Sequence, residues 1–142
     1  MEYVDPRGPR FAAWLTSAVL AVVLVTGSGW LLLAQTAVFA LGGFLGLRFA
    51  PYGLLYRVTL AKRLGPPTER EPAAPPRFAQ NVGFIFGAIG TAGYLGGLSW
   101  LGIVATALAL AAAFLNAAFG FCLGCEMYLL LKRITTPKGV TA

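Results

Sequence analysis

The two cysteines of the chain stand three residues apart, at Cys122 and Cys125, and Glu126 follows directly. Residues three or four apart share one face of a helix, so both thiols and the carboxylate can meet there. A helical pair with this spacing also has a Cα separation that a disulfide tolerates. The pattern predicts a thiol centre that cycles between dithiol and disulfide, or carries a persulfide, with Glu126 as proton acceptor.

The reactivity of these thiols depends on the local backbone. Near the C-terminus of one long helix, beside a carboxylate, a thiolate is disfavoured. If the helix breaks at Gly120, residues 121–133 form a new helix, and both cysteines lie in its first turn, where the helix dipole favours the thiolate. The alternative without chemistry is that Cys122 and Cys125 are small apolar packing residues.

Glu126 is the only acidic residue in the second half of the chain. A carboxylate beside an apolar span needs a partner, and we expect an ion pair with Arg48, with Lys132 and Arg133 as alternatives. Two thiolates and one carboxylate leave a zinc site one ligand short without a second subunit, and the chain has no histidine. We therefore expect no metal and no cofactor, and no motif specifies an enzyme.

The distribution of charge places this centre in a membrane protein. Residues 11–47 and 78–125 contain no Asp, Glu, Lys or Arg, and each stretch is about twice as long as one helical crossing requires. Each must cross, turn and cross back, with turns at Gly27-Ser28-Gly29 and Gly96-Gly97-Leu98-Ser99. All eleven Lys and Arg residues lie outside these stretches. Because basic segments stay in the cytoplasm, all three basic segments belong on that side.

The predicted fold is one all-α integral membrane domain, residues 1–142, with four transmembrane helices arranged as two helical hairpins. The spans are predicted at about residues 11–26, 30–47, 78–96 and 99–120. The linker 48–77 and the tail 132–142 are cytoplasmic, as are both termini, at the plasma membrane. The linker begins as a basic amphipathic segment, residues 48–64, that lies on the inner surface or continues the second span. It ends in a Pro-rich stretch, residues 65–77. The net charge of +6 indicates orientation and contact with anionic lipid rather than nucleic-acid binding.

The two predicted hairpins show a weak internal repeat. Each turns at a Gly/Ser cluster, resumes at a tryptophan and reaches a Gly-x-x-Leu-Gly pattern near the inner face. Parallel repeats about an axis along the membrane normal give this arrangement. Glycine pairs four residues apart occur at positions 42/46, 83/87, 93/97 and 120/124. Such pairs let helices approach closely, and the first three are expected to pack helices.

Four stretches of the sequence resemble one known family. They are Val4-Asp5-Pro6-Arg7-Gly8-Pro9-Arg10-Phe11, Leu47-Arg48-Phe49-Ala50-Pro51-Tyr52-Gly53, Pro76-Arg77-Phe78-Ala79-Gln80 and Phe121-Cys122-Leu123-Gly124-Cys125-Glu126-Met127-Tyr128. Together they resemble a family of integral membrane proteins common in actinobacteria and described as a domain of unknown function. The resemblance covers nearly the whole chain and implies a small multi-span bacterial membrane protein. Relatives in this family are sometimes associated with thioredoxin-like or sulfurtransferase-like proteins, and the family supplies no catalytic residues.

The leading hypothesis is a thiol-redox or sulfur-relay role at the inner membrane face, with a thioredoxin-like or sulfurtransferase-like protein as partner. The first alternative is a non-enzymatic membrane scaffold or subunit that associates through its Gly-xxx-Gly faces. The second alternative is a small-solute transporter with a path between the hairpins. Four spans are few for such a path unless the protein forms a homo-oligomer.

Overall fold

The computed structural model describes most of the chain as helix. The described residues are 3–4, 7–47, 50–60, 63, 65, 71–72 and 74–135. The helices are α1 (Arg7–Thr26), α2 (Gly29–Ala40), the π-helix η1 (Leu41–Leu45), α3 (Pro51–Val58), α5 (Ala74–Leu95), α6 (Ser99–Phe119) and α7 (Leu123–Thr135). Two short strands, β1 (Tyr3–Val4) and β2 (Glu71–Pro72), pair antiparallel. Apart from that pair, the predicted all-α fold is confirmed in the described part of the chain.

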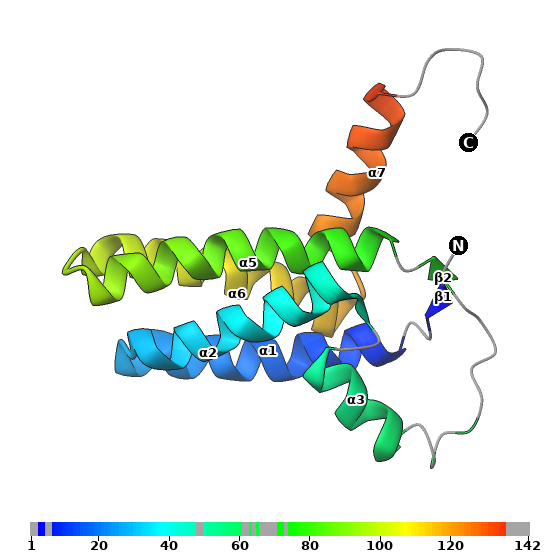
Figure 1. Ribbon diagram of the computed structural model, residues 1–142, viewed down its shortest axis with the longest axis horizontal. Coiled ribbons are helices and arrows are strands. Elements are labelled where there is room, and N and C mark those ends of the chain that lie inside the picture. Colours follow the sequence, from blue (N-terminus) through cyan, green and yellow to red (C-terminus); the bar gives the residue numbers. More distant parts are fainter. Residues whose placement is uncertain are drawn as a thin grey trace.

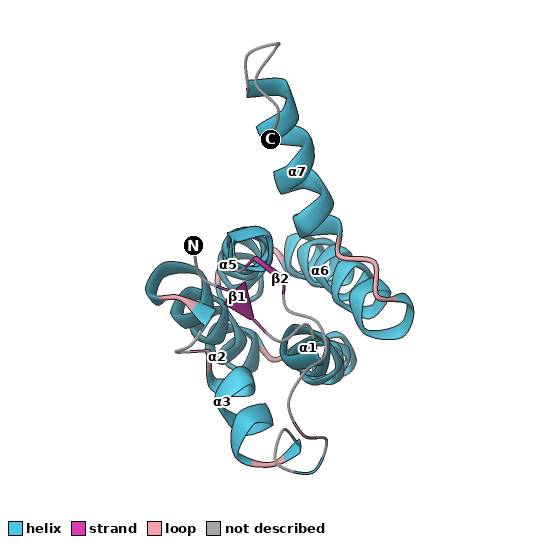
Figure 2. Cartoon of the chain, turned by 90° about the vertical axis from the view of Figure 1, so that its right-hand side faces the viewer, coloured by secondary structure: helices cyan, strands magenta, loops and turns pink. Residues whose placement is uncertain are grey.

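Four helical segments form an antiparallel bundle: α1, α2 continued by η1, α5 and α6 (Figure 1). Viewed along the bundle, α1 lies beside α6 and α2 beside α5 (Figure 2), and these pairs pack together. Both hairpin turns lie at one end, where Gly27 and Gly97 have φ of 68° and 90°. Glycine adopts such positive φ values without steric cost. The other end holds the start of α1 and α5, together with α3 and α7 (Figure 1).

The interior of the bundle depends on glycines of α5. A Cβ added at Gly83 would lie 2.8 Å from the ring of Phe39, and one added at Gly93 would lie 2.6 Å from the backbone of Gly102. Only glycine leaves room for the ring at the first position and for the neighbouring backbone at the second. The predicted packing role is therefore confirmed for these two glycines, whereas Gly46 and Gly97 provide positive φ instead.

The same contacts bear on the scaffold hypothesis. Gly87 faces the side chain of Thr36, and Gly90 faces Leu32, both from α2. Other helices of the same chain thus cover the Gly-xxx-Gly faces of α5. These faces of α5 are therefore not open to a partner protein, and the scaffold alternative would need another surface.

Two helices, α1 and α6, are long and apolar enough to cross a membrane by length and composition. α5 is 22 residues long, but its first turns carry Arg77, Gln80 and Asn81. The apolar segment Gly29–Leu45, which joins α2 and η1, is shorter. Of the four predicted spans, two meet these criteria within the described residues.

Two peripheral helices leave the bundle at the same end. After η1 the chain turns at Gly46, with φ of 116°, and forms α3; after α6 it turns at Gly120, with φ of 70°, and forms α7. The two helices point to opposite sides of the bundle (Figures 1 and 2). α3 lies within the predicted amphipathic segment 48–64, whereas α7 was expected only if the helix broke at Gly120.

Equivalent aromatic pairs hold these peripheral helices. Phe11 of α1 packs on Tyr56 of α3 with ring centroids 5.8 Å apart. Phe78 of α5 packs on Tyr128 of α7 with centroids 5.6 Å apart. The first helix of each hairpin therefore holds the peripheral helix in the same way, which supports the predicted repeat.

Candidate disulfide site

The site begins where α6 ends. Gly120 adopts the left-handed conformation, and its N–H donates to the Asn116 carbonyl at 3.0 Å. The N–H of Phe121 donates to the Leu115 carbonyl at 3.2 Å. The long apolar stretch therefore breaks at Gly120, and α7 begins as a separate helix at Leu123.

Arg10 of α1 caps the broken end of α6. Its Nε donates to the Ala117 carbonyl at 3.1 Å, and its Nη2 donates to the Ala118 carbonyl at 3.4 Å. The last carbonyls of a helix have no partner within the helix, and they carry the negative end of its dipole. The Arg10 guanidinium donates to these carbonyls and places a positive charge at the negative end of the dipole. It thereby fixes the loop that carries the cysteines.

Arg77 has the matching role in the other hairpin. Its Nε donates to the Gly43 carbonyl at 2.8 Å, and its Nη2 donates to the Phe44 carbonyl at 2.7 Å. Each arginine thus stands near the start of one hairpin and caps the second helix of the other. Sequence analysis missed this pair of caps, although Pro-Arg-Phe-Ala occurs at both residues 9–12 and 76–79.

Cys125 lies in the first turn of α7, Cys122 stands just before it, and the two form a disulfide. Their Cα atoms are 5.1 Å apart. Cys122 directly precedes the helix, and its carbonyl accepts the N–H of Glu126 at 3.0 Å. Its Sγ accepts the N–H of Cys125 at 3.1 Å. Cys122 therefore holds the N-cap position, where a side-chain acceptor meets the free N–H groups of the first turn.

Tight packing against α5 fixes the orientation of α7. A Cβ added at Gly124 would lie 2.6 Å from the Cα of Ala79. Together with the stacking of Phe78 on Tyr128, this contact presses the first turns of α7 onto the start of α5. The glycine between the two cysteines is therefore the contact point of the helices, and both cysteines are left half-buried beside it.

The structure leaves the predicted ion pair of Glu126 untested. Glu126 is exposed in the first turn of α7, and the alternative pairs with Lys132 or Arg133 stay predictions. Arg48 lies outside the described residues, so the expected pair with Arg48 stays a prediction.

A second polar contact lies at the same end of the molecule. The Tyr52 hydroxyl of α3 donates to Oε1 of Gln35 in α2 at 2.6 Å. Gln35 is buried, and its Nε2 has no hydrogen-bond partner in the described part of the chain. Burial raises the pKa of Tyr52 above its usual value. The contact fastens α3 to the bundle.

Two grooves lie on the outer surface of the bundle, away from the disulfide. One, of about 600 Å³, lies between α1 and α6 and is lined by apolar residues and Ser17. The other, of about 660 Å³, lies between α2 and α5. Neither is lined by a charged residue or by either cysteine. Within the described residues, no group of three or more His, Cys, Asp or Glu could hold a metal ion.

Together these features define a small helical-bundle protein with two helices able to cross a membrane and a disulfide at the start of a peripheral helix. The chain belongs to the family described as a domain of unknown function, DUF4395, whose family model matches residues 4–133. No curated protein and no solved structure matches the chain. The resemblance noted from the sequence is thus confirmed as far as the domain of unknown function.

Proposed function

We propose that this chain is a four-span protein of the plasma membrane that carries a thiol–disulfide centre, Cys122 and Cys125, at the inner membrane face. The observation that carries the proposal is the position of the disulfide. It lies at the N-terminus of a separate helix, with Cys122 Sγ accepting a backbone N–H. A packing role for two cysteines requires no such position.

The surface of the bundle supports the membrane assignment. α1, α5 and α6 have 20, 22 and 21 residues, which gives each a length of about 30 Å and matches the hydrocarbon core. Large apolar side chains are exposed along their flanks, among them Val22, Val25, Ile85, Ile103 and Leu108. An exposed apolar surface of this extent is suited to lipid.

Two tryptophans support the same assignment. Trp30 and Trp100 stand in the first turns of α2 and α6, and both are exposed. Indole rings favour the interface between membrane and water. With these turns at the outer interface, the basic end of the bundle and the disulfide lie at the cytoplasmic face.

The position of Cys122 supports a nucleophilic role in the reduced protein. The partial positive charge at a helix N-terminus favours a thiolate over a thiol. The Cys122 thiolate attacks one sulfur of a partner disulfide, and the other partner sulfur leaves as a thiolate. Cys125 loses its proton to Glu126 or water and attacks Cys122 Sγ. This step closes the Cys122–Cys125 disulfide and releases the second partner thiolate.

Two electrons thus pass to the partner, and the same steps in reverse reduce this chain. A soluble thioredoxin-like protein has the required dithiol–disulfide pair. A sulfurtransferase-like donor would instead carry a persulfide: the Cys122 thiolate attacks its outer sulfur, the donor S–S bond breaks, and the donor cysteine leaves as a thiolate.

The test is the redox state of the pair in intact membranes. Membranes that contain the full chain are equilibrated in dithiothreitol buffers of graded potential, quenched with acid and alkylated, and the protein is analysed by mass spectrometry. We expect the mass of the protein to change by two alkyl groups in a single step along the potential series, because opening the disulfide frees both thiols together. The variants Cys122→Ser and Cys125→Ser, which cannot close the ring, are the matched controls. Two thiols that are alkylated in every buffer, and therefore never form the disulfide, would refute the proposal.

A further inference from the structure

We propose that α7, together with α3, is a membrane-surface helix that binds anionic phospholipid headgroups and so holds the disulfide at headgroup level. The inference rests on the proposed membrane insertion of the bundle. It adds a lipid-binding surface that the thiol chemistry does not need.

The first observation is an uncovered apolar row on α7. None of the residues of α7 is buried. Leu123, Met127, Leu130 and Ile134 follow one another at helical spacing and therefore lie on one face. Their exposed fractions rise from 37% at Leu123 to 69% at Ile134. An apolar row that becomes more exposed away from the bundle requires a covering that the described chain does not provide.

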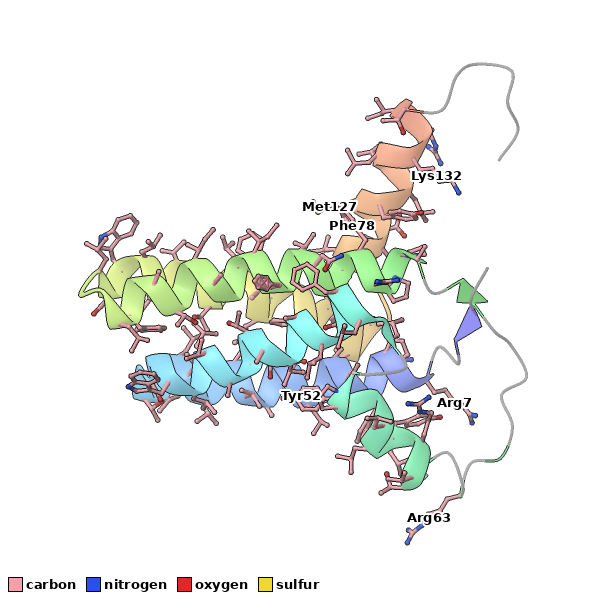
Figure 3. All side chains as sticks on the ribbon, in the orientation of Figure 1. Arg7, Tyr52, Arg63, Phe78, Met127 and Lys132 are labelled. Atoms are coloured by element: carbon pink, nitrogen blue, oxygen red, sulfur yellow. A yellow bond between two sulfur atoms is a disulfide. The ribbon has the colours of Figure 1, made fainter. Side chains whose placement is uncertain are left out.

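The second observation is the direction of the two faces. Met127 lies on the flank of α7 that faces along the bundle, whereas Lys132 points to the opposite flank, away from it (Figure 3). With the bundle inside the bilayer, the apolar row faces the hydrocarbon and the cation faces the cytoplasmic water. An interfacial helix has this arrangement.

The third observation is the matching helix on the other side. α3 leaves the same end of the bundle in the opposite direction (Figure 2), and its Leu54, Leu55 and Val58 are exposed. A partner protein bound in one groove would cover one helix. A planar lipid surface meets both helices at the same level, so the geometry favours the membrane as the occupant.

The charge of these helices selects the lipid. Lys132 and Arg133 stand in the last turn of α7, and Arg57 stands in the last turn of α3. Arg63 is exposed beyond α3 (Figure 3). Glu126 is the only acid on either helix. Basic residues beside an apolar surface attract anionic headgroups such as phosphatidylglycerol.

The position of α7 can be tested by spin labelling. The full chain with Cys122→Ser and Cys125→Ser receives a single reporter by Met127→Cys, Leu130→Cys or Arg133→Cys and is reconstituted in phosphatidylcholine–phosphatidylglycerol nanodiscs. We expect reporters at 127 and 130 to be several-fold more accessible to oxygen than to a water-soluble nickel chelate. The reporter at 133 should show the reverse. Equal access of the chelate to all three positions would overturn the inference.

Reporters on the bundle separate this inference from the proposed function. Val22→Cys and Ile103→Cys lie on exposed flanks of α1 and α6. If they are shielded from the chelate while all α7 positions are open to it, only the surface helix is wrong. If they are also open to the chelate, the membrane insertion itself fails, and both proposals fall.

The headgroup preference has its own test. Phospholipids with a spin-labelled headgroup broaden a reporter at Leu130→Cys when they gather around α7. We expect labelled phosphatidylglycerol to act at least three-fold more strongly than labelled phosphatidylcholine. Lys132→Gln with Arg133→Gln should remove the difference, and the charge-preserving pair Lys132→Arg with Arg133→Lys should keep it. Equal broadening by both lipids in the chain with its natural cations would refute the anionic preference.

Discussion

The sulfur of Cys122 differs from that of Cys125 in its relation to the helix, although both lie in one turn. Cys122 Sγ faces the N–H groups of the first turn and accepts one of them at 3.1 Å, whereas the Cys125 N–H is the donor. A helix N-terminus stabilises a nearby anion by about 1 kcal/mol. The two thiols of the reduced protein should therefore have unequal reactivity.

This inequality is the first prediction. In reduced protein at neutral pH, Cys122 should be alkylated about five-fold faster than Cys125, because roughly 1 kcal/mol of dipole stabilisation raises the thiolate fraction of Cys122. Each rate is measured in the variant that keeps only that thiol, Cys125→Ser for Cys122 and Cys122→Ser for Cys125. The measurement is the rate of iodoacetamide addition followed by mass spectrometry. Faster alkylation of Cys125 would show that the cap geometry does not govern the chemistry.

Tyr52 gives a second prediction, on stability and pH. Replacing Tyr52 by Phe removes the donor to the buried Gln35 carbonyl oxygen, which should cost about 1–3 kcal/mol of unfolding free energy. Burial raises the pKa of Tyr52 in the folded chain. The folded state therefore holds the phenolic proton more tightly than the unfolded state does. The contribution of the Tyr52 hydroxyl to stability is constant below the unfolded-state pKa of about 10 and declines above it.

The stability difference between the natural chain and Tyr52→Phe should therefore be constant at neutral pH and narrow in alkali. Thermal unfolding followed by circular dichroism in detergent measures it. Tyr128→Phe, which keeps a ring stacked on Phe78, is the control. A difference that widens above pH 10 would contradict the sign derived from burial.

Among the helices, the break between α6 and α7 determines whether the cysteines lie at a helix start. Gly120 holds a φ of 70°, and a residue with a Cβ loses about 1–2 kcal/mol in that conformation. Gly120→Ala should therefore favour a continuous helix through residue 121. The cysteines would then leave the first turn, and we expect Cys122 to lose its faster alkylation.

Gly46→Ala is the matched control for this third prediction. Gly46 makes the equivalent turn before α3, with φ of 116°, and lies far along the chain from the cysteines. The substitution should destabilise the fold at least as much, because φ 116° and ψ 156° is a conformation that non-glycine residues rarely adopt, and it should leave the alkylation rate of Cys122 unchanged. If both variants change the alkylation rate of Cys122 equally, the effect comes from general destabilisation of the fold and not from loss of the helix break at Gly120.

The sequence predicts the helices well but their contacts poorly. The uncharged stretches indicate two helical hairpins because backbone groups in an apolar environment must bond within the helix. α1 and α5 begin about a turn before the predicted spans, since Pro9 and Pro75 fall in first turns, where proline is tolerated. The break at Gly120 appears in the sequence only as one of two alternatives.

The candidate site is visible in the sequence only as the cysteine spacing. Its position depends on Arg10, which bonds to a carbonyl 107 residues away, and on the contact of Gly124 with Ala79. Such long-range contacts leave no local pattern, because helical periodicity reports which face is apolar and not which helix covers it. The repeated Pro-Arg-Phe-Ala segment is the one signal that could have indicated the paired caps.

At the scale of the whole molecule, the two hairpins are tied together by reciprocal arginine caps at one end. Arg10 joins α1 to α6, and Arg77 joins α5 to η1, which continues α2. Hydrogen bonds from a charged donor contribute about 1.5–3 kcal/mol each when partly buried. The bundle should therefore lose stability if either arginine is removed, although the helices themselves remain intact.

The fourth prediction concerns these caps. Arg10→Gln and Arg77→Gln should each lower the free energy of unfolding by about 2 kcal/mol, because two helix-end carbonyls lose a cationic donor. The two caps share no residue, so the double variant should lose about the sum of both. Unfolding in graded sodium dodecyl sulfate, followed by circular dichroism, gives these values. Arg133→Gln removes the same charge from a peripheral helix and should change stability by less than about 0.5 kcal/mol. A loss in Arg133→Gln as large as that in Arg10→Gln would mean that net charge, and not the capping geometry, holds the hairpins together.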